Sequence, residues 1–376
     1  MAEKSDSQRN APQLSWKGRV VLLIVGLFFA ALVLELGLRA VAAMKNPRAH
    51  EGWTIPGGDP NEYWAIYDPD LGYRQNPKFG DMNSDGLRDH PIGPKQGRFR
   101  VLFLGDSVAV YGNNADDTFV GHLRAELKKD PALQDVDVID AGIKGYTNYQ
   151  EVLYLKKYGL QFEPDLVGFQ FCMNDLFKFL HSFQVENGKL VTGTYQFSTE
   201  AVQKAPESWP VRLAKKSHLI VWAYNNLPIA RSAAELQTRQ GFSFDYRRDI
   251  RTAWQDAPWQ DIENQLKEAV ELGRERKFPV FVVALPVAVQ YQADYLVKDR
   301  DYVLKPQRKL REICERLKIP FYDMYPEMNA SLFVKDGIHL TADGRRQVGE
   351  KIAAFLAGQG LLKPSQPGSG EQKPGH

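Results

Sequence analysis

From Arg100 onward the chain alternates short apolar runs with amphipathic segments, and this rhythm limits the folds that it can adopt. Apolar runs typical of buried strands cover residues 101–104, 136–139, 166–171, 280–285 and 320–323. Helical spacing covers residues 118–129, 149–158, 262–277, 302–317 and 342–356. Strands that alternate with helices predict an α/β fold, here a parallel five-stranded sheet with helices on both faces.

Polar clusters follow the first three predicted strands, and another precedes the last predicted helix. They contain Gly105, Asp106 and Ser107 after the first strand, residues 140–145 after the second, Asn174 and Asp175 after the third, and Asp336 and His339 before the helix. Ligands of open parallel sheets bind at the carboxyl ends of the strands. We therefore expect these residues to meet at one edge of the sheet, with Gly105, Asp106 and Asp175 in supporting positions.

The side chains in these clusters have the chemistry that acyl transfer requires. A serine hydroxyl is a weak nucleophile that needs a base within hydrogen-bond reach, and His339 can serve as that base for Ser107. A carboxylate on the other ring nitrogen fixes the imidazole tautomer, and Asp336 can fold back to supply it. The developing oxyanion needs preorganised donors. The candidates are the backbone N–H groups of Ser107 and Gly145 and the side-chain amide of Asn174.

The same segments resemble the sequence blocks of the SGNH, or GDSL-like, hydrolases. VLFLGDSV resembles the first block, AGIKGYT the second, MND the third and DGIHLTADG the fifth, over roughly residues 100–356. The upstream segments DPDLGYR and MNSDGLRD are similar to segments of membrane-anchored bacterial members. The resemblance implies a three-layer flavodoxin-like sandwich, with Ser107 as nucleophile, His339 as base and Asp336 as its orienting group. It also implies an oxyanion hole of Ser107, Gly145 and Asn174.

Two positions depart from the family pattern. The third block usually begins with glycine, where this chain has Cys172, and the second often has asparagine, where it has Asp140. Cys172 follows an apolar strand and is expected to be buried packing rather than a nucleophile. Asp140 would either add a negative charge near the oxyanion or cap the following segment. Whether Cys172 pairs with Cys314 stays open, and neither a metal nor a cofactor is expected because the remaining histidines show no ligand spacing.

The N-terminus carries an unbroken apolar run from Val20 to Leu34. A helix over residues 20–43 would span roughly 36 Å, enough to cross the hydrocarbon core of a membrane. Glu35 and Arg39 lie four residues apart, so that they can pair on one helix face. The positive residues that precede the run (Lys4, Arg9, Lys17 and Arg19) predict a cytoplasmic N-terminus and an exported remainder. A signal peptide cleaved after Ala40-Val41-Ala42 is the alternative, and it also exports the rest of the chain.

These signals divide the 376 residues into five parts. A cytoplasmic tail (1–19) and a transmembrane signal-anchor (20–43) precede an irregular, aromatic-rich segment (44–99) that we expect to pack on the catalytic domain. The hydrolase domain covers 100–362, with an insertion at about 178–256 that is helical in part around 210–227. The Pro/Gly/Ser-rich tail 363–376 is expected to be disordered. A net charge of +2 gives no reason to expect a nucleic-acid partner.

The expected activity is that of a serine esterase or acyltransferase working through an acyl-enzyme. Its location in the bacterial inner membrane, with the domain facing the periplasm, suggests O-acetyl groups on a cell-envelope or exported polysaccharide. Membrane-bound acyltransferases and polysaccharide export proteins are then expected partners. A lipid or thioester hydrolase and a catalytically silent glycan-binding scaffold are the alternatives. Aromatic residues of the insertion would form a sugar platform, an acyl groove or only a subdomain core: Phe177, Phe179, Phe183, Tyr195, Phe197, Trp209, Trp222 and Tyr224.

Overall fold

The computed structural model describes residues 15–45, 53–54, 63–195, 217, 219–220, 242–245, 247 and 249–363. The chain divides into two compact units, one formed by residues 1–50 and 204–237 and the other by residues 51–203 and 238–376. Most of the helix expected around 210–227 lies outside the described residues.

The first unit contains helix α1 (Trp16–Lys45). Its segment Trp16–Ala40 has a mean hydropathy of 2.7 and is not buried against protein, so it is long and apolar enough for a membrane anchor or a signal sequence. Arg39 Nε donates to Glu35 Oε1 at 2.7 Å, which confirms the predicted pair. Glu35 Oε2 also accepts hydrogen bonds from Ser217 Oγ at 2.9 Å and from the Leu219 N–H at 2.7 Å. The carboxylate is therefore held within its own unit.

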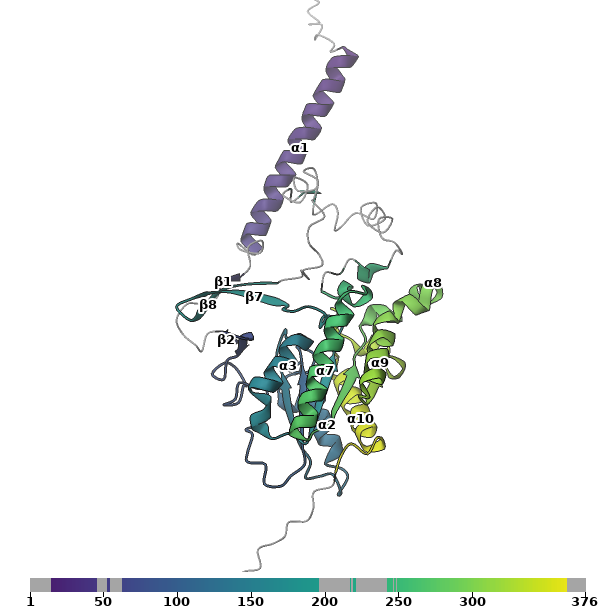
Figure 1. Cartoon of the computed structure of the whole chain (residues 1–376). Coiled ribbons are helices and arrows are strands. Elements are labelled where there is room, and N and C mark those ends of the chain that lie inside the picture. The colour runs from purple at the N-terminus through teal and green to yellow at the C-terminus, as the bar shows by residue number, and fades with distance from the viewer. Residues whose placement is uncertain are drawn as a thin grey trace, which may run out of the picture. The chain divides into compact units, whose positions relative to one another are not determined.

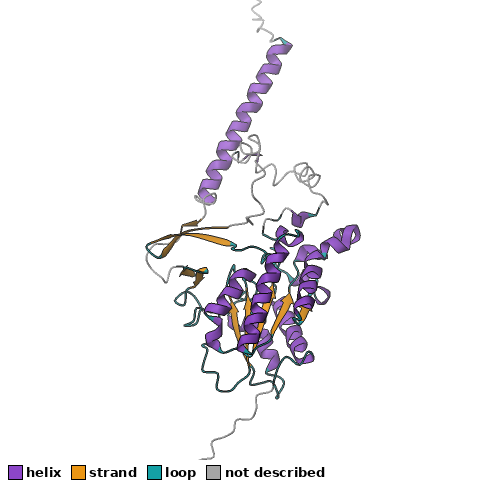
Figure 2. Ribbon diagram, viewed as in Figure 1, coloured by secondary structure: helices purple, strands orange, loops and turns teal. Residues whose placement is uncertain are grey.

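The second unit is built on a five-stranded sheet, which confirms the predicted fold class (Figures 1 and 2). Its strands are β4 (Arg100–Gly105), β5 (Asp137–Gly142), β6 (Leu166–Phe171), β9 (Val280–Ala284) and β10 (Phe321–Asp323). All neighbouring pairs are parallel, in the order β5-β4-β6-β9-β10. This is the flavodoxin-like order, whose switch point lies between the first and third strands, here β4 and β6.

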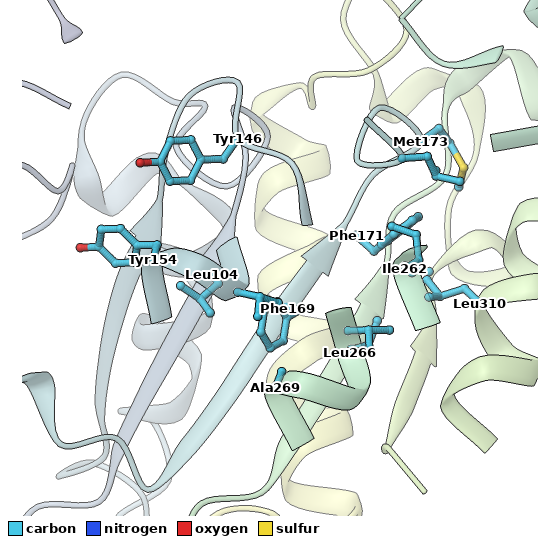
Figure 3. Packing of buried hydrophobic residues seen from close by; sticks show 14 of the residues in the cluster. Leu104, Tyr146, Tyr154, Phe169, Phe171, Met173, Ile262, Leu266, Ala269 and Leu310 are labelled. Atoms are coloured by element: carbon cyan, nitrogen blue, oxygen red, sulfur yellow. The ribbon is translucent and has the colours of Figure 1, made fainter. Parts of the chain in front are cut away.

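Helices cover both faces of the sheet because successive strand side chains point to opposite sides. On one side Leu102 and Leu104 pack with α3 (Asn148–Lys157), α7 (Pro258–Arg276) and α9 (Lys305–Leu317) (Figure 3). On the other side Val101 and Phe103 pack with α2 (Phe119–Leu127) and α10 (Ala342–Gly358). This two-residue periodicity gives the three-layer sandwich.

The predicted helix 302–317 covers the last two residues of one helix and the whole of the next. α8 (Ala293–Val303) ends before Leu304, whose backbone is not helical, and α9 begins at Lys305. Pro306 lies in the first turn of α9, where its missing N–H leaves no helical hydrogen bond unmade. Short 3-10 helices cover Ala115–Asp117, Gly159–Phe162, Ser243–Asp245, Arg251–Trp254, Ala288–Tyr291, Tyr325–Glu327 and Ala330–Leu332.

Antiparallel strands occur where the sequence analysis expected none. β2 (Ala65–Asp68) and β3 (Gly72–Gln75) form one hairpin. β7 (His181–Glu186) and β8 (Lys189–Tyr195) form another inside the expected insertion, and β1 (Trp53–Thr54) pairs with β8. The two hairpins bring aromatic side chains together beside the loop that follows β5.

Candidate active site

Ser107 lies in the loop that follows β4, the first strand of the parallel sheet. Gly105 ends the strand and its carbonyl accepts the Ile143 N–H at 2.9 Å, which ties this loop to the one after β5. Asp106 Oδ1 accepts the Val108 N–H at 2.8 Å, so the chain turns sharply around Ser107. The Ser107 side chain remains half-buried at this turn.

The loop that carries Asp336 and His339 closes on itself before α10. The Val334 N–H donates to the His339 carbonyl at 2.9 Å, and Asp336 Oδ1 accepts the N–H groups of Ile338 and His339 at 2.8 and 2.9 Å. Partial burial alone would raise the pKa of Asp336. The hydrogen bonds from Ile338 and His339 outweigh burial and hold this pKa below its ordinary value. The loop thus presents an ionised carboxylate next to the imidazole.

Ser107, His339 and Asp336 form a hydrogen-bonded series across 232 residues of sequence. His339 Nε2 lies 2.9 Å from Ser107 Oγ, and His339 Nδ1 lies 2.7 Å from Asp336 Oδ2. The carboxylate can only accept, so Nδ1 carries the proton and Nε2 faces the hydroxyl as an acceptor. The arrangement can withdraw the hydroxyl proton and return it later in a reaction.

The three candidate oxyanion donors follow the three neighbouring strands at the switch point. Gly145 adopts φ +76°, and a Cβ there would lie 2.7 Å from His181 Nε2. Asn174 Nδ2 donates to Asp106 Oδ2 at 3.1 Å, which leaves its second amide hydrogen for another acceptor. Asp175 Oδ2 accepts the Cys172 N–H at 2.6 Å and so shapes the loop that bears Asn174.

The structure shows the surroundings of Cys172 and Asp140, the two residues that depart from the family pattern. Cys172 and Cys314 are free and buried, and burial raises the pKa of the Cys172 thiol well above its ordinary value, as expected of packing. Asp140 is buried, accepts the Gly142 N–H at 3.0 Å and bonds Thr118 Oγ1 at 3.2 Å. Burial, followed by the charge of Asp89, raises the pKa of Asp140 to about 8. Asp140 is therefore a capping group that is mostly neutral at pH 7.

Other residues near the site were not singled out from the sequence. The ring of Tyr111 stacks on His339, and Arg247 Nη1 donates to the Asp336 carbonyl at 3.1 Å. His181 is buried against Gly145, and burial, with the nearby Lys144 charge, lowers its pKa to about 4. These residues are close to the triad only in the folded chain, and no local sequence motif predicts that proximity.

Within the described part of the chain, no group of His, Cys, Asp or Glu could hold a metal ion.

A flavodoxin-like sheet with serine, histidine and aspartate in series at its carboxyl edge defines a serine hydrolase. The sequence pattern of the GDSL-like lipase/acylhydrolase family matches residues 103–347, and the chain belongs to that family. No curated protein matches the chain.

Similar folds occur among solved structures. The crystal structure of TesA is 13% identical, with 70% of this chain and 99% of that chain covered and a TM-score of 0.41. A lipase/acylhydrolase from Enterococcus faecalis is 17% identical, with 71% of this chain and 99% of that chain covered and a TM-score of 0.40. The acetyl xylan esterase AlAXEase is 14% identical, with 69% of this chain and 100% of that chain covered and a TM-score of 0.40. At these identities the likeness concerns the fold.

Proposed function

We propose that Ser107, His339 and Asp336 hydrolyse or transfer acyl esters through an acyl-enzyme. Ser107 Oγ attacks the ester carbonyl carbon while His339 Nε2 takes its proton, and Asp336 stabilises the imidazolium. The oxyanion accepts hydrogen bonds from the Ser107 and Gly145 N–H groups and the Asn174 amide. The observation that carries this proposal is the unbroken series of contacts, 2.9 Å and 2.7 Å, on both sides of the imidazole.

The first half of the reaction ends when His339 gives its proton to the leaving alcohol as the carbon–oxygen bond breaks, and the acyl group remains on Ser107. The second half repeats these proton transfers with a new nucleophile. Water or an acceptor hydroxyl then attacks the acyl-enzyme, with Nε2 taking its proton and later returning it to Ser107 Oγ. The difference between an esterase and an acyltransferase is therefore the second nucleophile, and the same residues serve both.

The substrate class that we propose is an O-acetylated polysaccharide outside the cytoplasmic membrane. The apolar helix α1 supports export of the domain, and an exported domain would have access to such glycans. Among the described residues the triad is partly accessible, since the side chains of His339 and Asp336 are 22% and 47% exposed. A partly accessible triad supports an ester on a long chain over one held in an enclosed acyl tunnel. Membrane-bound acyltransferases and export proteins remain the partners that this location suggests.

The test is turnover of 4-nitrophenyl esters by the purified full chain in detergent. We expect activity on the acetyl ester to exceed that on octanoyl and longer esters, and Ser107→Ala to lower turnover by about 1000-fold or more. Ser331→Ala, an exposed serine in Ala330–Leu332, is the matched control and should retain full activity. A fluorophosphonate probe should label Ser107 and no other residue. Near-full activity of Ser107→Ala would exclude the serine mechanism.

A further inference from the structure

The ring of Tyr111 lies directly against the histidine of the candidate triad. Its centroid is 4.5 Å from that of His339, with 28° between the ring planes. Tyr111 is 37% exposed, and its hydroxyl makes no hydrogen bond to any described residue. The feature that a tyrosine supplies here is therefore its flat ring. We propose that Tyr111 is a positioning residue that holds the His339 imidazole in the plane facing Ser107, an inference that rests on the proposed function.

The hydrogen bonds of His339 leave one motion of its ring weakly restrained. Asp336 and Ser107 contact the two ring nitrogens at 2.7 and 2.9 Å. Tilting the ring about the line that joins its nitrogens lengthens neither contact much, but it turns the Nε2 lone pair away from the serine proton. A second ring stacked on the imidazole face opposes that tilt.

Tyr111 is itself supported by a buried arginine that connects the two halves of the site. The Arg345 guanidinium lies 5.7 Å from the centre of the Tyr111 ring. It donates to the Asp117 carbonyl at 2.5 Å, to Asp117 Oδ2 at 2.7 Å and to the Leu340 carbonyl at 2.9 Å. Asp117 follows the Ser107 loop in the chain, and Leu340 directly follows His339. The arginine thus joins the segment after the serine to the segment after the histidine, with the Tyr111 ring beside it.

The test compares Tyr111→Ala and Tyr111→Phe with a matched control, Tyr67→Ala. Tyr67 lies on β2, is also 37% exposed and makes no contact with the triad. With 4-nitrophenyl acetate we expect Tyr111→Ala to lower kcat about 10- to 100-fold with KM within about threefold, since small misplacements of catalytic groups have effects of that size. Tyr111→Phe, which keeps the ring, should restore kcat to within about twofold, and Tyr67→Ala should match the wild type.

A second measurement does not depend on turnover. Diethyl pyrocarbonate modifies exposed imidazoles, and peptide mass spectrometry follows its reaction at His339. Loss of the stacked ring should raise that rate several-fold in Tyr111→Ala, whereas Tyr111→Phe and Tyr67→Ala should keep the wild-type rate. Unchanged kcat, or an unchanged modification rate, in Tyr111→Ala would overturn the role of Tyr111. A wild type that neither turns over esters nor labels at Ser107 would instead refute the proposed function, and the modification rates would still decide the role of Tyr111.

Discussion

At the scale of single residues, the site is surrounded by buried carboxyl groups at the ends of its strands. Asp106 follows β4, Asp140 lies in β5 and Asp175 follows β6, and all three are nearly inaccessible to solvent. Burial raises the pKa of each, because a low-dielectric surrounding disfavours the charged form. Raised pKa values limit the negative charge of these carboxyl groups. Ionised carboxylates at the same positions would repel an oxyanion at the proposed site.

Asp140 makes stability depend on pH in a direction that can be measured. Its pKa is about 8 in the folded chain against an ordinary value of 3.8, so between these values the folded state binds more protons than the unfolded state. Stability attributable to this group therefore falls as pH rises from about 4 to about 8, by up to about 1.4 kcal/mol per pH unit. Asp140→Asn removes the titration, keeps an oxygen that can accept the Gly142 N–H, and places an amide donor beside Thr118 Oγ1. We expect its melting temperature to exceed that of the wild type increasingly from pH 5 to pH 8.

The control for this prediction is an exposed aspartate. Asp343 lies in the first turn of α10, where hydrogen bonds from Arg346 and Gln347 lower its pKa. It stays ionised from pH 5 to pH 8, so Asp343→Asn should shift melting temperatures equally across that range. A gap between Asp140→Asn and the wild type that does not widen with pH would contradict the assignment of a neutral Asp140.

Asn174 is expected to act on turnover rather than on substrate binding. Removal of one oxyanion donor typically costs ~2.7–4 kcal/mol of transition-state stabilisation. Asn174→Ala should thus lower kcat about 100- to 1000-fold and leave KM nearly unchanged, because the interaction forms only in the transition state. It should also lower stability, since Asp106 Oδ2 loses its buried partner. Steady-state kinetics and thermal melting separate the two effects, and an unchanged kcat would remove Asn174 from the oxyanion hole.

Cys172→Gly tests whether the unusual cysteine disturbs that loop. Cys172 packs among the buried side chains under α2 and α10, so its loss should reduce stability by roughly 1–2 kcal/mol. Its N–H bond to Asp175 Oδ2 comes from the backbone and survives the substitution. Turnover should then stay within a few-fold of the wild type. An increase in turnover would mean that the cysteine side chain distorts the segment bearing Asn174.

At the scale of elements, two hairpins fix the loop that carries Gly145. The Tyr73 hydroxyl, from β3, donates to the Lys144 carbonyl at 2.9 Å, and the Tyr146 hydroxyl donates to the Tyr73 carbonyl at 2.7 Å. His181, from β7, stacks on Tyr73 with ring centroids 5.7 Å apart. The loop that carries Gly145 is therefore held by segments on both sides of it in the sequence, residues 63–75 and 181–195.

Gly145→Ala should disturb this loop through both backbone strain and a clash. The new Cβ would lie 2.7 Å from His181 Nε2 and 3.0 Å from the Tyr73 hydroxyl, neither of which can move freely. We expect kcat to fall by about 10- to 100-fold as the N–H donor shifts. Gly188→Ala is the matched control, because Gly188 has a similar φ of +74° but open space around it. It should lower stability by about 1 kcal/mol and leave kcat unchanged. Equal kinetics for the two variants would contradict the role of Gly145.

Strands β4, β5, β6 and β9 could be predicted because they are buried almost throughout and read as apolar runs, whereas β10 at the edge of the sheet is half-buried. The candidate positions of Ser107, Gly145 and Asn174 were predicted from the rule for carboxyl ends, since each comes after such a run. Their role as oxyanion donors stays a prediction. The β7–β8 hairpin was missed although Asn187-Gly188 is a strong two-residue turn signal, and both residues have positive φ. Its pairing with Trp53–Thr54 depends on contacts distant in sequence, which no local pattern encodes. Tyr111 was missed for the same reason, because only the folded chain brings it to His339.

At the scale of the whole molecule, the chain combines a hydrolase unit with helix α1, whose apolar segment Trp16–Ala40 has no buried share. The apolar side chains of α1 are mostly exposed, including Leu23, Phe28 and Leu34. A contiguous apolar surface of this length is unfavourable in water and suits a bilayer. Its one acidic residue within the apolar region, Glu35, is satisfied by Arg39, Ser217 and Leu219. These hydrogen bonds reduce the cost of placing a carboxylate near the end of a membrane span.

We expect the mature chain to keep residues 20–43 and to fractionate with the inner membrane. The reason is the apolar length of α1 together with the positive residues that precede it, which favour an N-terminus on the cytoplasmic side. Intact-mass spectrometry should find residues 20–43 present, and alkaline carbonate should leave the protein in the membrane pellet. Alkaline phosphatase fused after His376 should be active, because it folds only outside the cytoplasm. A mature N-terminus at Ala43 would instead identify α1 as a signal peptide and leave a released hydrolase.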